Sequence, residues 1–361
     1  MNETLALDKH SCPACGAQAE WHPRRQVLAC AYCETESPYE IDADGEIREI
    51  DLVRTLREMP DELRGWKAEK RTVACRSCKA VSVFDPTRVG QNCDFCGSPE
   101  LVDYEEIKAP IRPQSLLPFK VSAEQIRESL RRWFKGRWFA PGALKSKAMV
   151  DTVHGVYIPY WTFDAQADCP WQAESGHYYY TSETYRDSQG RTQTRQVRHV
   201  RWRPASGRVE HAFDDQPVSG THGVDATLLD KIEPFPTTEL VPYDTAYLSG
   251  FVVEHYRVVL VDAAQQARQA MEQHLERLCA ERVPGDTYRN LQISPVYSEQ
   301  TFKHILVPVW LLTYTYRNTP FQIVANGYTG EIAGRYPKSF WKIFFLIMTA
   351  VVVIATVLFV L

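Results

Sequence analysis

The sequence predicts an α+β protein with two N-terminal four-cysteine zinc ribbons and one C-terminal transmembrane helix. Three observations predict it: four Cys-x-x-Cys pairs, mixed strand and helix patterns in the middle of the chain, and an uncharged apolar run at its end. The chain has 361 residues, enough for two or three domains. With 44% hydrophobic and 24% charged residues, its composition excludes a mainly disordered or collagen-like chain.

The cysteine pairs have the spacing of zinc ribbons. They are Cys12 and Cys15, Cys30 and Cys33, Cys75 and Cys78, and Cys93 and Cys96, with 14 residues between the pairs of each ribbon. Each pair forms a tight turn, and a short strand excursion brings two turns around one tetrahedral ion. We therefore predict two Zn²⁺ ions, each bound by four thiolates. Disulfides or redox-active cysteine pairs are the alternative. Disulfides are typical of exported proteins, and a redox-active Cys-x-x-Cys pair normally occurs singly.

The two ribbons are copies of each other. A shift of 63 residues aligns every cysteine and places Trp21 on Phe84 and Pro23 on Pro86. Such a repeat indicates duplication of a small module that uses metal in place of a core. The predicted segments are ribbon one at 1–50, a linker at 51–69, ribbon two at 70–108, an α+β domain at 109–338 with a possible internal duplication, and an anchor at 339–361.

The charge of the ribbons argues against nucleic acid as their partner. Residues 1–51 contain 11 acidic and 4 basic residues, and residues 70–105 contain five of each. Phosphate contacts need clustered Lys and Arg. The ribbons are therefore expected to bind protein or to brace a neighbouring domain.

Two helices are expected in the middle of the chain. Ser122 and Gln125 form a capping box, followed by a stripe of Ile126, Leu130, Trp133 and Phe134. The second helix is expected to begin near Asp262, with Gln265 completing its capping box, and to end before Pro284 and Gly285. Both stripes favour core packing over a binding site.

Strands are expected around these helices. Residues 156–163 and 306–312 each enter an apolar strand through a proline, with Trp161 or Trp310 two residues later as a core anchor. Asn326 and Gly327 predict a hairpin turn between residues 321–325 and 328–333.

A basic hairpin is expected between these two strands. Residues 178–203 alternate in a way that suggests a polar hairpin turning at 187–190, and residues 186–208 contain seven arginines and one acid. The hairpin is either a solvated β face or a docking surface for anionic lipid headgroups or an acidic partner. Cys169 and Cys279 have no close cysteine neighbour in the sequence and are expected to be inert core thiols.

The last residues predict a membrane anchor. Residues 343–361 contain no charged side chain and would span about 28 Å as a helix, close to a bilayer's hydrocarbon core. Arg335, Lys338 and Lys342 precede this run, and the N-terminus lacks a signal peptide. We therefore expect a single-pass, tail-anchored protein of the inner membrane with its N-terminal domains in the cytoplasm.

Common catalytic motifs are absent from the sequence. It contains no GxxxxGK[ST], GxGxxG, GxSxG or HExxH. We predict no catalytic or cofactor-binding residues beyond the metal ligands, although an enzyme without a linear signature stays an alternative.

Taken together, the two ribbons, the Pro-x-Trp segments, the Asn-Gly-Tyr-Thr-Gly hairpin and the apolar end resemble a bacterial family. It is the family of double zinc-ribbon membrane proteins associated with phage-shock protein A and SPFH-domain proteins. The resemblance covers nearly the whole chain and implies a non-enzymatic adaptor that recruits or organises such a partner at the membrane during membrane stress. It also implies that the eight ribbon cysteines are the metal ligands. Contact with membrane lipid and homo-oligomerisation stay open, and a membrane-tethered nucleic-acid-binding protein is a further alternative.

Overall fold

A large mixed sheet forms the centre of the computed structural model, which describes residues 10–37, 47–58, 71–75, 80–84, 93, 95, 101–103, 111–141, 153–186, 188, 190–316 and 319–360. Its 13 strands include the path β10-β7-β13-β8-β11-β5-β4-β6, and β1 and β2 form a separate two-stranded sheet. The strands are β1 (Ala19–His22), β2 (Val27–Cys30), β3 (Ile50–Asp51), β4 (Arg71–Cys75), β5 (Val81–Phe84), β6 (Leu101–Asp103), β7 (Ser115–Leu116), β8 (His154–Arg186), β9 (Thr192–Ser219), β10 (Val241–Pro242), β11 (Val252–Glu254), β12 (Thr287–Ile293), β13 (Val296–Tyr316), β14 (Thr319–Asn326) and β15 (Ile332–Gly334). The helices are α1 (Leu52–Glu58), α2 (Ala123–Lys135), α4 (Ala226–Leu229), α5 (Leu260–Arg282) and α6 (Phe340–Val360), with short 3-10 turns η2 (Thr237–Glu239) and η3 (Thr245–Leu248).

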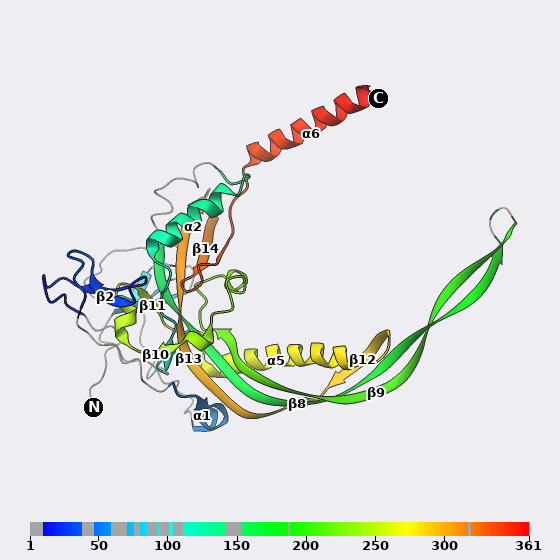
Figure 1. Ribbon diagram of the computed structural model, residues 1–361, viewed down its shortest axis with the longest axis horizontal. Helices are drawn as coiled ribbons and strands as arrows, with labels where there is room; N and C mark the ends of the chain where they lie inside the picture. Colours follow the sequence, from blue (N-terminus) through cyan, green and yellow to red (C-terminus); the bar gives the residue numbers. More distant parts are fainter. Residues whose placement is uncertain are drawn as a thin grey trace.

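Three long strands make the protein mainly β, which corrects the predicted α+β class. β8, β9 and β13 have 33, 28 and 21 residues. Figure 1 shows them as one long curved sheet with α5 along it. The sequence predicted short strands here, each entered through a proline, Pro159 or Pro308. Both prolines instead lie inside long strands, where Pro159 pairs with Leu306 and Pro308 with Tyr157. Pairing on both sides of each proline continues the strand through it.

The predicted helix after Ser122 is confirmed with its cap. The Ser122 hydroxyl accepts a hydrogen bond from the Gln125 backbone, and the Gln125 side chain accepts one from the Ser122 backbone. Ile126, Leu130 and Phe134 are its buried face. The second predicted helix is confirmed as α5, which ends before Pro284, but its predicted cap is wrong: α5 begins at Leu260, and the N-cap residue Val259 makes no side-chain capping hydrogen bond.

Three hydrophobic clusters fill the space around the sheet. One joins α2 to β13 and to Trp21 of β1, a second packs the α5 stripe of Ala267, Met271 and Leu275 against β8 and β9, and a third lies between the ribbon-two segment and β8. Trp161 is fully buried and Trp310 is 5% exposed, so the prediction that both are core anchors is confirmed. The sheet therefore binds the cysteine-rich N-terminal segments to the rest of the chain.

The predicted transmembrane anchor is wrong. Within the described part of the chain, no helix is at once long enough and apolar enough to pass through a bilayer. The predicted single-pass topology and inner-membrane localisation depended on this anchor and are corrected with it.

Candidate metal centre

Two matching turns bring the four cysteines of ribbon one together. Each turn begins at the first cysteine of a pair, Cys12 or Cys30, whose sulfur accepts a hydrogen bond of 3.4 Å from the backbone nitrogen two residues later. The residue after each pair, Gly16 or Glu34, has a left-handed backbone with φ of 73° or 58°. This conformation lets the chain reverse and the backbone nitrogens point at sulfur. The antiparallel pairing of β1 and β2 then places the two turns side by side.

The four sulfur atoms form a compact cluster. Sγ of Cys12 lies 3.5 Å from Sγ of Cys33, and Sγ of Cys15 lies 3.5 Å from that of Cys30 and 3.6 Å from that of Cys33. All four sulfurs lie within 4.8 Å of one another. A zinc ion with four sulfurs at about 2.3 Å has sulfur–sulfur distances near 3.8 Å, whereas a disulfide needs about 2 Å. The four cysteines are free thiols, and their arrangement suits a tetrahedral metal ion.

The surroundings of Cys33 favour a thiolate. A hydrogen bond with the Thr35 hydroxyl, 3.2 Å from Sγ, and a second with the Thr35 backbone lower the pKa of Cys33 to about 6. A thiolate, rather than a thiol, is the form that binds metal. The site therefore offers at least one ligand that is ready to bind at neutral pH.

Ribbon one is fixed to the large sheet by its β1 strand. The Trp21 indole nitrogen donates a hydrogen bond of 3.3 Å to the carbonyl of Phe119, and its ring packs on Tyr247 with centroids 4.5 Å apart. The Trp21 backbone nitrogen also donates to the carbonyl of Ser249, and the Ser249 hydroxyl donates to that of Ala19. Cys15 and Cys33 remain exposed on the other side of the ribbon. The metal centre is thus held rigidly at the surface.

Ribbon two is described only in part. Cys75 and Cys93 are buried, whereas Cys78 and Cys96 lie outside the described residues. The Cys75 backbone nitrogen donates to the carbonyl of Ala80, as Cys12 does to Ala17 and Cys30 to Thr35. The first turn of ribbon two therefore shares one hydrogen bond with both turns of ribbon one. The second metal site stays a prediction.

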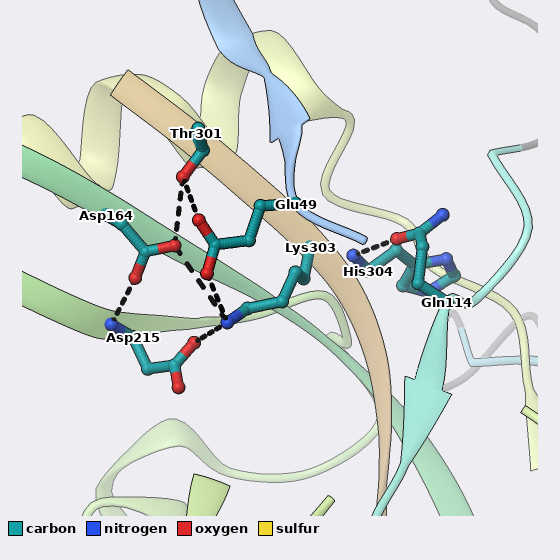
Figure 2. A network of polar contacts seen from close by, with 7 residues as sticks. All are labelled: Glu49, Gln114, Asp164, Asp215, Thr301, Lys303 and His304. Atoms are coloured by element: carbon teal, nitrogen blue, oxygen red, sulfur yellow. Dashed lines mark hydrogen bonds and ion pairs between the residues drawn. The ribbon is translucent and has the colours of Figure 1, made fainter. Parts of the chain in front are cut away.

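A second polar cluster lies inside the curved sheet, and sequence analysis missed it. Lys303 of β13 has a side chain only 9% exposed, and its Nζ lies 2.7 Å from Asp215, 3.4 Å from Glu49 and 3.9 Å from Asp164. Thr301 donates hydrogen bonds to Glu49 and Asp164, as Figure 2 shows. Burial lowers the pKa of Lys303, but the hydrogen bond and charge of Asp215 outweigh it, so its pKa is raised. The charged ammonium group of Lys303 therefore links four separate segments of the chain.

Glu254 is a buried carboxyl next to ribbon two. It is 1% exposed, and neither of its oxygens has a hydrogen-bond partner among the described residues. A Cβ at Gly223 would lie 3.1 Å from its Oε1 and 2.8 Å from both Ala80 and Phe95. Burial raises the pKa of Glu254 to about 8, against the smaller opposing effects of Thr221 and the charge of Arg257. The carboxyl is therefore neutral at neutral pH.

Glu254 should make stability fall as the pH rises. Its folded-state pKa lies above the ordinary value, so the folded state retains a proton that the unfolded state loses between about pH 4.5 and pH 8. Glu254→Gln removes this titration. We expect the free energy of unfolding of the variant, measured by urea unfolding, to rise relative to that of the parent by on the order of 4 kcal/mol between pH 5 and pH 9. Glu331→Gln, at an exposed carboxylate, is the control and should leave the pH dependence unchanged.

Cys169 and Cys279 are closer than the sequence indicated. Their sulfurs lie 3.8 Å apart in the core between β8 and α5, although 110 residues separate them in the chain. Burial raises the pKa of Cys279 to about 12, which keeps that thiol protonated. The prediction of core thiols is confirmed, but they form a pair that the linear sequence did not reveal.

Comparison with known proteins gives one distant relative and no function. A protein of Bacillus subtilis (strain 168), described as "Uncharacterized protein YdjG", is 24% identical over 252 residues, which are 66% of this chain and 68% of that protein. No protein-family model matches the chain. No solved structure matches it either.

Proposed function

We propose that this protein is a non-enzymatic zinc-ribbon adaptor that captures a membrane-associated protein partner of the phage-shock protein A or SPFH type. Zn²⁺ is the proposed ion, in ribbon one and also in ribbon two. The observation that carries the proposal is the exposed tip of the ribbon-one metal centre. There, Tyr32 lies between two metal-ligand cysteines and is 84% exposed.

The tip has the features of a protein-docking surface. The side chains of Glu34 and Glu36 beside it are 83% and 59% exposed, and Arg25 lies 4.0 Å and 3.8 Å from them. Tyrosine is enriched among the residues that contribute most to binding at protein interfaces. The opposite side of the ribbon is occupied by the packing of Trp21 on the sheet. A rigid, metal-held tyrosine with acidic neighbours suits a partner with a basic, partly apolar surface.

The test measures binding of the zinc-loaded full chain to purified phage-shock protein A-type and SPFH-type proteins by biolayer interferometry. Tyr32→Ala should weaken the complex at least about tenfold, because removal of an interface anchor costs about 1–2 kcal/mol or more. It should leave the zinc content unchanged, since the side chain binds no metal. Tyr180→Ala, at a tyrosine 60% exposed elsewhere on the protein, is the matched control. If neither partner binds the parent chain, or if the two variants bind equally well, the proposal is wrong.

A further inference from the structure

The β8–β9 hairpin extends far beyond the rest of the sheet. β12 pairs with β8 only as far as Gly176, and beyond that residue β8 and β9 pair only with each other among the described strands. We refer to residues 177–203 as the arm. Figure 1 shows it projecting from the body as a twisted two-stranded ribbon. The arm contains six arginines and two acidic residues, a net charge of +4 in a chain of net charge −4.

The arginines of the arm lie on both faces of the ribbon. Residues that pair directly across two strands share a face. Arg198 pairs with Tyr180, which places it on one face, whereas Arg201 pairs with His177 and Arg203 with Ser175 on the other. All three arginines are exposed. The ribbon therefore presents positive charge in two opposite directions.

Aromatic rings, not carboxylates, contact two of these arginines. The guanidinium of Arg198 lies 4.4 Å from the ring centre of Tyr178, and that of Arg201 lies 5.4 Å from the ring centre of Tyr179. Such stacking orients a guanidinium without neutralising its charge. Among the described residues, Arg198, Arg201 and Arg203 form no ion pair, whereas Arg195 is paired with Glu183 at 3.1 Å. Three charges thus remain available for an anionic partner.

The remaining side chains of the arm are mostly polar. Its strands contain Thr, Gln, Ser, His and four tyrosines, with two valines and no Leu, Ile, Met or Phe. The one tryptophan, Trp202, is half-buried, and its ring lies 4.2 Å from the guanidinium of Arg289. A surface that enters a bilayer interface normally contributes a continuous apolar face, which the arm does not have. Hydroxyl, amide and guanidinium groups are the groups that contact phosphate oxygens and base edges.

We propose that the arm is a binding site for a nucleic-acid duplex and that the ribbon lies in the groove with arginines directed at the phosphates on both walls. The major groove of B-form DNA is wide enough for a two-stranded β-ribbon. A strongly twisted ribbon with charge on both faces can contact two walls at once, whereas a flat lipid surface would meet one face at a time. This inference is independent of the proposed adaptor function, because ribbon one plays no part in it.

The test uses a fluorescent 30-base-pair DNA duplex and the full chain, with anisotropy measured between 50 and 300 mM KCl. The triple variant Arg198→Gln/Arg201→Gln/Arg203→Gln should bind at least about tenfold more weakly at low salt. The slope of log affinity against log salt should also fall by about 3, close to one unit for each lost phosphate contact. The matched control, Arg131→Gln/Arg132→Gln/Lys135→Gln, removes the same charge from the exposed surface of α2 and should retain the parent's slope.

Two further probes identify the class of partner. Vesicles of phosphatidylglycerol and phosphatidylcholine, and poly-glutamate, present negative charge without a groove. The proposal is overturned if the arm variant binds the duplex as the parent does, if both triple variants lose the same affinity, or if vesicles or poly-glutamate bind the arm more tightly than the duplex. Circular dichroism of both variants establishes that the fold is retained.

Discussion

Cys30→Ser is expected to release the metal ion of ribbon one and to unfold residues 10–37. Cys30 is 2% exposed and contributes one of four sulfurs, and a serine hydroxyl is a poor substitute for a thiolate ligand. The binding free energy of structural zinc is about 10–16 kcal/mol at neutral pH, so the folding of a small ribbon depends on it. Elemental analysis should find one zinc ion fewer per chain in the variant than in the parent.

The effect should reach the large sheet as well. Because Trp21 belongs to the core cluster around Phe119 and Trp310, unfolding of ribbon one leaves part of that core uncovered. Loss of a buried tryptophan typically costs about 3–5 kcal/mol, so thermal unfolding of the remaining domain should shift downward. Cys279→Ser, at a buried cysteine far from the cluster, is the control and should keep the parent's zinc content. Equal zinc in Cys30→Ser and the parent would contradict the assignment of the site.

Lys303→Met should destabilise the protein by about 3–5 kcal/mol, because it leaves Asp164 and Asp215 without their buried counter-charge. These carboxylate side chains are only 14% and 13% exposed. Burial already raises the pKa of Asp164, and loss of the lysine should raise it further. A carboxyl whose pKa is higher in the folded state than in the unfolded state lowers the free energy of unfolding when the pH is above its folded-state pKa. At lower pH it lowers the free energy of unfolding less. The loss measured by urea unfolding should therefore be smaller at pH 5 than at pH 8.

Lys120→Met provides the comparison for this variant. Lys120 lies 3.5 Å from Glu239, but both side chains are about half exposed. Pairs of this kind contribute about 1 kcal/mol or less. If Lys303→Met is no less stable than Lys120→Met, the buried cluster does not contribute as we infer.

Local features were readable from the sequence. The ligand spacing of ribbon one and the capping box at Ser122 each involve residues close in the chain, where turn geometry and one or two hydrogen bonds decide the outcome. The polar hairpin with its turn near residues 187–190 belongs to the same group. The start of α5 was predicted wrongly because Asp262 and Gln265 matched a capping pattern that tertiary packing did not use.

Features that join distant segments needed the tertiary structure. The Lys303 cluster draws on residues 49, 164, 215 and 303, and the Cys169–Cys279 pair spans 110 residues, so no linear pattern marks either. The same holds for the continuous length of β8, β9 and β13, because neighbouring strands support the chain through prolines that predict a break on their own. The sequence by itself determined the four-sulfur centre, since its ligands and turns are local. Only the tertiary structure decided that this centre is fixed to a mainly β body and that a basic arm extends from it, because packing and pairing energies between distant residues set both.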